Sequence, residues 1–431
     1  MSSTPIGVDR AAIELVVQLA SPVAAPLRAE GFTAYVVGGF VRDLLVGRGY
    51  SDDIDMTTSA HPGEIKKLIA PIADDVWLQG ERFGTIGCRI DGTDFEITTH
   101  RAERYDESSR KPLVEFASAI ETDLSRRDFT VNAMAIAVPG GELVDPFGGA
   151  DDLADRLLRT PADPAASFND DPLRILRAAR FQAGYDLMAV EELVVAATDL
   201  VDRLEIVSKE RIRVELDKLL TTDDPTCGLG FISTVGAWPW ILPDMHGVSS
   251  DSVLSSIALA VSPDADSQLL ARRALLFRAA NTAQDAADEL RTLRYSNAEK
   301  RRTIAVISAI DLVIDSDGLP LDIGSATLRR VIQLVNHDWM AALVAFRAVS
   351  SELGETLESE WNRLSASEDL SKLGPGLTAA EVMSVLDIDS GPMVGAANEE
   401  LTRIRIEEGP LAKDKLRWLL SRWFESRTLD A

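Results

Sequence analysis

Two acidic residues that follow a glycine turn carry the clearest chemical information in this chain. The turn is Gly38-Gly39, directly after the apolar run 34–37, and the acids are Asp53 and Asp55. Glycine lets a backbone approach a triphosphate closely. In a strand, Asp53 and Asp55 project from one face, where they can share divalent cations. The pattern predicts a phosphoryl-transfer site that holds Mg²⁺, a cation that binds a few carboxylates together with substrate phosphates.

A third carboxylate is expected from a neighbouring strand. Glu96 alternates with apolar residues in the run 95–99 and is the first candidate, with Asp94 second. Arg42, four residues after Gly38, is expected to pair with the nucleotide or with Asp43. An Asp-x-Asp alone is more often a capped polar turn, so the preceding glycine motif is what favours catalysis.

Short strands and helices are predicted to position these residues. Apolar runs indicate strands at 34–37, 85–90, 94–98 and 134–138, and Asp91-Gly92 indicates a hairpin turn. Helical spacing predicts helices up to about residue 20, with a break at Pro22 and Pro26, and at 62–70 and 125–133. After residue 151 helical patterns take over. We therefore expect an α+β fold, with a mixed-sheet head (1–150), an all-α neck (151–235) and an all-α body and tail (236–431).

Composition narrows the class of protein. The 431 residues are 46% hydrophobic and 26% charged, which is typical of a globular protein. Two cysteines and four histidines without metal-ligand spacing argue against a disulfide framework or a zinc cluster. We expect no apolar run of membrane-spanning length, no membrane partner and a cytoplasmic location. The net charge of −25 opposes general nucleic-acid binding but leaves room for a local basic groove.

Five motifs occur in a family's order and resemble the class II nucleotidyltransferases. This family comprises bacterial CCA-adding tRNA nucleotidyltransferases and poly(A) polymerases, built on a DNA polymerase β-type head. The matching segments are the glycine turn with Asp53-Ile54-Asp55, then 105–112, 126–135, 170–181 and 208–215. One departure is Asp170, where the family usually has Glu.

The resemblance implies a template-independent enzyme that adds CCA to the 3′ end of tRNA from CTP and ATP. It assigns catalysis to Asp53, Asp55 and Glu96, with Mg²⁺ on the first two. It implies that segment 105–112, with Asp106 and Arg110, is a flexible loop needed for A addition, and that segment 208–215 braces a nucleotide-templating helix. The implied nucleotide-binding residues are Gly38, Gly39, Arg42, Arg127, Asp128, Asn132, Asp171, Arg174, Arg177 and Arg180.

Hydrogen-bonding capacity explains how Asp171 and Arg174 would read a base. Cytosine and adenine both present an amine donor beside a ring-nitrogen acceptor, and uracil and guanine present the reverse. An Asp acceptor beside an Arg donor would accept C and A and refuse U and G. The two residues are three apart and share a helix face. A helix N-cap role competes for the Asp171 oxygens, because Pro172 suits a first helical turn.

Further arginines are expected to bind phosphate. Arg174, Arg177 and Arg180 recur every three residues, and pairing with acids such as Asp186 is the alternative. Arg127 is expected to neutralise phosphate near a helix start, Asp128 to orient Arg127 or bond the ribose, and Asn132 to contact the sugar. Eight basic residues between 272 and 302 either line an RNA-facing surface or form ordinary solvated helix faces; they are Arg272, Arg273, Arg278, Arg291, Arg294, Lys300, Arg301 and Arg302.

The second half of the chain departs from many relatives, which carry a His-Asp (HD) phosphohydrolase module. Leu242–Met245 and Leu293–Lys300 resemble its flanks, but the segment 275–280 between them contains no His-Asp pair. We expect a degenerate HD-like region without metal or phosphatase activity. Three other functions remain open: poly(A) or A-only addition, RNA binding without catalysis, and nucleotidyl transfer to a small molecule. The oligomeric state is also open.

Overall fold

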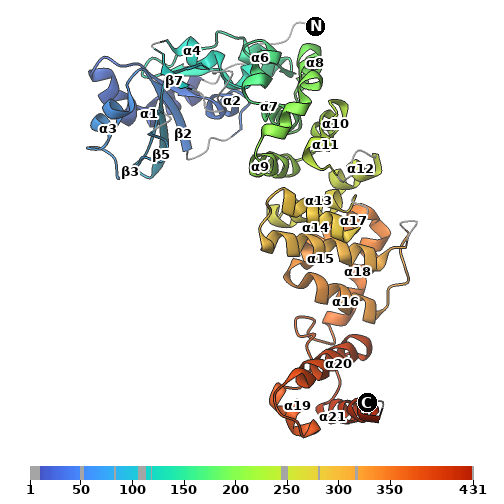
Figure 1. Cartoon of the computed structure of the whole chain (residues 1–431). Coiled ribbons are helices and arrows are strands. Elements are labelled where there is room, and N and C mark those ends of the chain that lie inside the picture. Colours follow the sequence, from blue (N-terminus) through green and yellow to red (C-terminus); the bar gives the residue numbers. More distant parts are fainter. Residues whose placement is uncertain are drawn as a thin grey trace. The chain divides into compact units, whose positions relative to one another are not determined.

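The computed structural model describes residues 10–48, 53–81, 84–104, 113–117, 119–243, 251–279, 282–315 and 319–429 (Figure 1). The chain packs as two compact units. The first contains residues 1–211 and 231–240, and the second contains 212–230 and 241–431. The head and most of the predicted neck therefore belong to one unit. The three functional regions expected from the sequence, with bounds at 150 and 235, stay a prediction.

A seven-stranded mixed sheet forms the centre of the head, as predicted. Its strand order is β3-β4-β5-β2-β1-β8-β9. The strands are β1 Ala34–Val37, β2 Asp53–Thr58, β3 Asp75–Trp77, β4 Thr85–Ile90, β5 Thr93–Thr99, β8 Ala135–Ala137 and β9 Leu143–Val144. All neighbouring pairs are antiparallel except β2 and β5, which run parallel. The hairpin at Asp91-Gly92 is confirmed, because both residues have positive φ, as a two-residue hairpin turn requires.

Helix α1 (Arg10–Ala29) is longer than predicted and continues through Pro22 and Pro26. Its face of Val16, Ala20, Val23, Ala24 and Leu27 is buried, and the helix packs against β1. Pro22 and the Gln18 residue whose carbonyl it leaves without a helical donor are both exposed, so water can satisfy that carbonyl. The predicted break was therefore wrong because packing of the apolar face outweighs the local cost of proline.

Among the described residues, α1 is also the one helix whose length and apolar composition match a membrane span. That match corrects the expectation that no run approaches this length. A buried core helix and a signal sequence near the N-terminus pass the same test, and α1 lies near the N-terminus with one buried face of five residues.

Short elements complete the head. They are α2 Gly39–Leu45, α3 Pro62–Ile69, α4 Ile120–Ser125, the 3₁₀ helix η2 Thr130–Asn132 and the antiparallel pair β6 Arg101–Arg104 and β7 Leu113–Phe116. The helix predicted at 125–133 was wrong, since α4 ends at Ser125. Asp128 is the physical reason: its carboxylate accepts the Phe129 amide at 2.9 Å and so competes with helical hydrogen bonds.

The remaining part of the first unit is mainly helical. It contains α5 Gly149–Ala154, α6 Pro164–Asp170, α7 Arg174–Tyr185, α8 Glu191–Asp199, η3 Val201–Ile206 and α11 Trp238–Ile241, with the small parallel pair β10 Leu157–Leu158 and β11 Met188–Ala189. Helices α9 (Lys209–Leu220) and α10 (Thr226–Thr234) have residues in both units, and the last residue of α11, Ile241, belongs to the second unit.

The regular elements described in the second unit are helices, apart from an isolated bridge between Ile314 and Pro320, which confirms the all-α body and tail. The neck, predicted to be all-α, also contains the short strand pair β10 and β11. Its elements are α12 Asp251–Leu259, α13 Ala265–Phe277, α14 Ala283–Thr292, α15 Asn297–Val313, α16 Ser325–Val335, η4 Asn336–Asp338, α17 Trp339–Val349, α18 Ser351–Ser365, α19 Ala379–Leu386, α20 Pro392–Glu408 and α21 Lys413–Leu429.

Candidate active site

The carboxylates predicted for metal binding lie on two adjacent parallel strands. The register places Asp55 opposite Glu96 and Asp53 opposite Asp94. Along β2, Ile54 and Met56 alternate with the two aspartates and are buried on one face of the strand. Asp53, Asp55 and Glu96 are exposed on the other face. The structure thus brings the three predicted catalytic carboxylates together on one face of two central strands of the sheet.

Asp94, the second candidate for the third carboxylate, is held by an arginine. Its oxygens accept Arg89 Nε at 2.6 Å and Nη2 at 2.9 Å, and this pairing lowers the pKa of Asp94. Glu96 is therefore the better third carboxylate.

Asp55 experiences the strongest electrostatic conflict in this cluster. The side chain reaches solvent, but the surrounding protein desolvates it and raises its pKa to about 6; Arg127 opposes the rise, and Glu96 and Asp53 add to it. Three carboxylates that repel one another at one solvent-accessible place are a donor set that a hard cation would stabilise.

These carboxylates suit a metal ion through the chemistry of their oxygen donors and not through a preformed coordination cage. Among the described ranges no group of three or more His, Cys, Asp or Glu side chains has the geometry of a metal site. Asp53 and Asp55 with Glu96 fit a cation whose remaining ligands come from substrate phosphates, as Mg²⁺ commonly has.

The glycine turn lies directly beside Asp55. Gly38 has φ +75°, a conformation that favours glycine. A Cβ on Gly38 would lie 3.0 Å from Arg127 Nη1 and 3.6 Å from Asp55 Oδ2. The turn, one carboxylate and one guanidinium therefore meet within a few ångströms, which is the arrangement predicted for a triphosphate site.

Arg42 is committed to the protein interior. It donates to both Asp43 oxygens at 3.0 and 2.9 Å, to Asn132 Oδ1 at 2.5 Å and to the Tyr185 hydroxyl. Its guanidinium also lies 4.1 Å from the centre of the Tyr185 ring. Of the two partners expected for Arg42, the structure shows Asp43. Four of its five N–H groups are used, so Arg42 fixes α2 against α7 beneath the glycine turn.

Asp128 and Asn132 belong to the same buried network. Asn132 donates to Asp128 Oδ1 at 2.9 Å, and Arg177 donates to Asp128 Oδ2 through Nε at 2.8 Å and through Nη2. Burial alone would raise the pKa of Asp128, but Arg177 and Asn132 hold it below its usual value. Asp128 thus orients Arg177 rather than Arg127. Arg177 pairs with Asp128 and not with Asp186, which binds Arg156.

Asp123 is the site residue that the sequence analysis missed. It is 1% exposed and accepts Arg126 Nη2 at 2.8 Å, Arg127 Nη2 at 3.2 Å and the Arg101 amide at 3.1 Å. Burial would raise its pKa, but Arg127 and Arg126 outweigh that effect and lower it. The available signal was spacing: Asp123 precedes the arginine pair by three and four residues at a helix end.

The predicted base-reading residues lie between α6 and the first turn of α7. Arg174 donates to Ser167 Oγ at 2.6 Å and to the Arg126 carbonyl at 2.6 Å. Asp171 accepts the Leu173 amide at 3.2 Å, which is a capping contact, although the N-cap residue of α7 is Leu173. Both side chains are partly exposed. Each Asp171 oxygen accepts one hydrogen bond from the protein, which leaves lone pairs able to bind a base.

Helix α9 supports Asp171, as the resemblance implied. Arg211 donates to Asp171 Oδ2 at 2.7 Å. Arg174, Arg177 and Arg180 share one partly exposed face of α7, between buried neighbours, as the three-residue spacing predicted. Arg180 lies 4.5 Å from the centre of the Phe181 ring. Asp106 and Arg110 lie outside the described residues.

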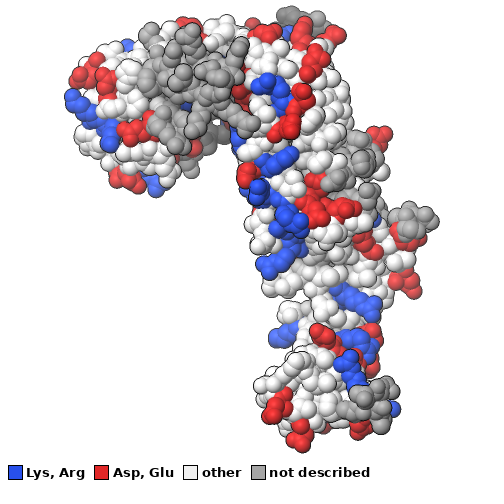
Figure 2. All heavy atoms as spheres, viewed as in Figure 1, with Lys and Arg blue, Asp and Glu red and all other residues white. Residues whose placement is uncertain are grey.

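The basic residues between 272 and 302 divide into three groups. Arg272 is fully buried and Arg273 is 5% exposed, so neither expectation, an RNA-facing surface or a solvated helix face, holds for these two. Three arginines form ion pairs: Arg278 with Asp311, and Arg291 with Asp288. Arg302 pairs with both Asp266 and Asp338. Arg294 and Arg301 are exposed and Lys300 is half-buried. Figure 2 shows basic side chains gathered over the α13–α15 region of the second unit.

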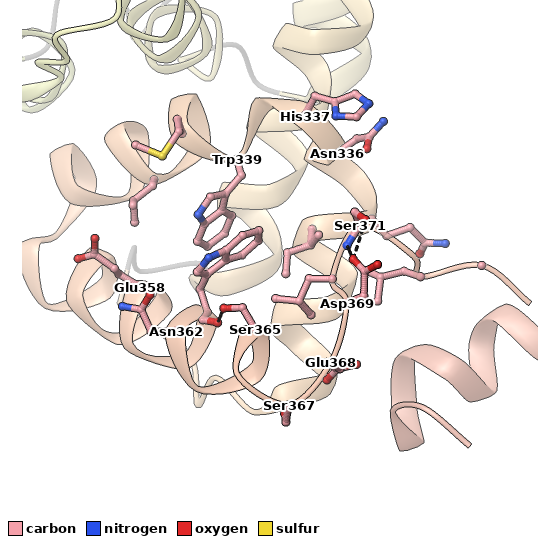
Figure 3. A pocket seen from close by; sticks show the side chains of 18 of the residues that line it. Asn336, His337, Trp339, Glu358, Asn362, Ser365, Ser367, Glu368, Asp369 and Ser371 are labelled. Carbon is pink, nitrogen blue, oxygen red and sulfur yellow. Dashed lines mark hydrogen bonds between the residues drawn. The ribbon is translucent and has the colours of Figure 1, made fainter. Parts of the chain in front are cut away.

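A separate groove of about 1300 Å³ lies in the second unit (Figure 3). The rings of Trp339 and Trp361 stack in it, with 4.5 Å between their centres. Its acidic members bind internal partners: Glu358 pairs with Arg347, and Asp369 pairs with Lys372. Glu368, the third acidic residue of the groove, pairs with Arg329 and Arg405.

Comparison with known proteins agrees with this site. Residues 34–159 match the poly A polymerase head domain family, and residues 188–247 match a family described as the probable RNA and SrmB-binding site of polymerase A. A crystal structure of the Bacillus stearothermophilus CCA-adding enzyme in complex with CTP superposes with a TM-score of 0.77 at 23% identity. The superposition covers 96% of this chain and 99% of that one, and shows the shared fold.

Sequence relatives carry the assignment further. The CCA-adding enzyme of Streptococcus gordonii is 41% identical over 231 residues, which span 53% of this chain and 56% of that enzyme. The CCA-adding enzyme of Lactococcus lactis subsp. lactis is 36% identical over 294 residues, which span 68% of this chain and 72% of that enzyme. With this extent of identity, the chain belongs to the CCA-adding enzyme family.

Proposed function

We propose that this protein adds CCA to the 3′ end of tRNA from CTP and ATP and releases pyrophosphate. The observation that carries the proposal is the parallel register of β2 and β5, which brings Asp53, Asp55 and Glu96 together beside Gly38 and Arg127. Family membership supplies the substrates, since relatives are CCA-adding enzymes and one solved relative holds tRNA. The cytoplasm, where tRNA matures in bacteria, is the proposed location.

The reaction forms a bond between the tRNA 3′-oxygen and the α-phosphorus of the nucleotide and breaks the bond to the β-phosphate. Asp53 and Asp55 would hold Mg²⁺, and Glu96 would complete the carboxylate set. When bound, Mg²⁺ would neutralise phosphate charge and lower the cost of deprotonating the attacking hydroxyl. Gly38 and Gly39 would let the backbone approach the triphosphate, and Arg127 would neutralise it. Positioning and charge neutralisation would supply most of the rate enhancement.

The remaining predicted residues would recognise the base, contribute positive charge or hold other parts of the site in position. Asp171 and Arg174 would read the pairing edge of C or A. Arg177 and Arg180 would contribute positive charge along α7. Arg42, Asp128 and Asn132 would hold the glycine turn and α7 in place, because their polar atoms are already bonded to one another and to Arg177.

Stepwise extension tests the proposed function. Purified protein is given three tRNA transcripts, which end before the first C, the second C and the final A, with one nucleotide at a time. We expect CTP to extend the first two and ATP the third. Extension by ATP, and not by CTP, of a transcript that ends before the first or the second C would indicate A addition or poly(A) synthesis. No extension of the shortest transcript by CTP would contradict the proposal, and an Asp53→Ala variant controls for contaminating polymerases.

A further inference from the structure

The feature that carries a further inference is the buried carboxylate of Asp123, in the last turn of α4. Its two oxygens serve different partners. Oδ1 accepts Arg126 Nη2 and the Arg101 amide, and Oδ2 accepts Arg127 Nη2. Asp123 is itself 1% exposed and cannot touch a substrate. Its influence on any reaction must act through these neighbours.

Through Arg127, Asp123 is connected to the carboxylate cluster of Asp53, Asp55 and Glu96. Nη2 of Arg127 is held by Asp123, and Nη1 lies 3.0 Å from the position that a Cβ on Gly38 would occupy. Asp55 Oδ2 lies 3.6 Å from that same position. The fork geometry of a guanidinium means that fixing one nitrogen fixes the direction of the other. Asp123, together with the Asn132 carbonyl that accepts Arg127 Nη1 at 3.5 Å, therefore orients Arg127 toward the place where the glycine turn and Asp55 meet.

The Arg126 side of Asp123 leads to the base-reading residues. Asp123 and Arg126 form an i,i+3 pair across the C-terminus of α4, and Arg126 is the C-cap residue of that helix. The backbone carbonyl of Arg126 accepts Arg174 Nη2 at 2.6 Å. The side-chain pair thus fixes the backbone whose carbonyl holds Arg174.

We propose that Asp123 is a positioning residue that sets the phosphate-binding Arg127 and the base-reading Arg174 relative to each other. The proposal rests on the proposed function and extends it to base selectivity. A single ionised carboxylate binds both Arg127 and Arg126. Its loss should therefore affect nucleotide affinity and nucleotide choice together.

Kinetics of Asp123→Asn test the proposal. The amide is nearly the same size, but it carries no charge and presents N–H groups to one of the two guanidiniums. On tRNA that ends before the first C, we expect the KM for CTP to rise about tenfold, since a charge-assisted bond that orients Arg127 is removed. We also expect the preference for CTP over UTP, as a ratio of kcat/KM values, to fall about tenfold.

Asp152→Asn is the matched control. Asp152 is a buried head carboxylate, 4% exposed, that accepts Thr130 Oγ1 at 2.6 Å and pairs with Arg159. Loss of this pair should lower the melting temperature, as in Asp123→Asn, but leave the CTP KM and the CTP preference within twofold of wild type. Equal kinetic changes in both variants would show that Asp123 acts only through stability and would overturn the proposal.

Two further variants separate the effect that passes through Arg127 from the effect that passes through Arg126. They also keep the proposal testable if Asp123→Asn does not fold. Arg127→Met should raise the CTP KM with little change in CTP preference, and Arg126→Ala should lower the preference with little change in KM. The reverse pattern, or no effect of Arg126→Ala on the preference for CTP, would overturn the proposal that Asp123 positions Arg174 through Arg126. Failure of the wild-type protein to extend this tRNA with CTP would instead contradict the proposed function itself.

Discussion

At the scale of single residues, the site is defined by charges that the metal-free protein does not balance. Desolvation by the surrounding protein is the main cause that raises the pKa of Asp55 to about 6; Arg127 opposes the rise, and Glu96 and Asp53 add to it. A carboxyl whose folded pKa lies above its unfolded value of about 3.9 destabilises the fold when ionised. This penalty is absent below about pH 4, grows between pH 4 and 6, and is complete above pH 6. Exposure of Asp55 to water reduces its size.

Asp55→Asn should therefore stabilise the metal-free protein while abolishing nucleotide transfer. We expect a melting temperature above that of wild type at pH 7.5 in EDTA, and a difference that shrinks towards zero at pH 4. Added Mg²⁺ should raise the melting temperature of wild type more than that of the variant, because ligands stabilise the state that binds them. A lower melting temperature for Asp55→Asn in EDTA at pH 7.5 would contradict this account of the cluster.

Gly38→Ala tests the close approach at the glycine turn. Alanine at φ +75° costs about 1 kcal/mol, and its Cβ would stand 3.0 Å from Arg127 Nη1. Gly31→Ala is the control, because Gly31 has φ +86° and open space around its Cβ position. Both variants should be destabilised to a similar extent in urea unfolding. Only Gly38→Ala should weaken CTP binding, by about tenfold in calorimetry, since a displaced Arg127 no longer makes its charge-assisted bond to the nucleotide; equal affinities would argue against a role for this turn.

At the scale of elements, buried arginines fasten helix ends together. Arg272 in α13 is fully buried and donates to five carbonyls. Leu220 ends α9, and Thr222 and Asp223 follow it; Ile257 lies in the last turn of α12, and Ala260 directly follows that helix. Helix C-termini attract cations because their last carbonyls lack helical donors.

Arg272→Met should destabilise the second unit strongly. It leaves several buried carbonyls without donors, at a cost of roughly 3 kcal/mol or more. Arg330→Met is the control: Arg330 is exposed, pairs with Glu407 at 3.1 Å, and should cost less than about 1 kcal/mol. Urea unfolding measures both. CTP binding, which belongs to the head, should persist in Arg272→Met at denaturant concentrations below its transition.

The limits of sequence analysis are clearest at this scale. The strands, the Asp91-Gly92 hairpin and the shared face of Asp53 and Asp55 follow from local periodicity, so they were predictable. The prolines of α1 misled because packing outweighed a local cost. Contacts between distant side chains have no local signal: Arg42 meets Tyr185 143 positions later, and Arg177 meets Asp128 49 positions earlier. Arg272 looked like a surface cation because composition does not report burial.

At the scale of the whole molecule, an acidic protein must bind an anionic polymer. The net charge of −25 repels RNA at long range, so attraction must come from local basic residues. In the second unit Arg301 is exposed and Lys300 half-buried, both on α15. They are better candidates for phosphate contacts than the buried Arg272 and Arg273.

Lys300→Ala/Arg301→Ala should weaken tRNA binding without changing CTP affinity. We expect the slope of log affinity against log salt concentration to shrink by about one for each tRNA phosphate that the variant no longer neutralises. Filter binding across a potassium chloride series measures this slope. An unchanged slope and affinity would show that these two residues make no contact with tRNA phosphates.

We propose that Asp53, Asp55 and Glu96 hold cations beside Asp171 and Arg174, which read the incoming base. Anomalous diffraction from a crystal of the chain with Mn²⁺ and a non-reactive CTP analogue tests it most directly. We predict manganese peaks within coordination distance of Asp53 and Asp55, and the cytosine edge bonded to Asp171 and Arg174. Manganese bound away from these carboxylates, or a cytosine that faces away from Arg174, would contradict the account.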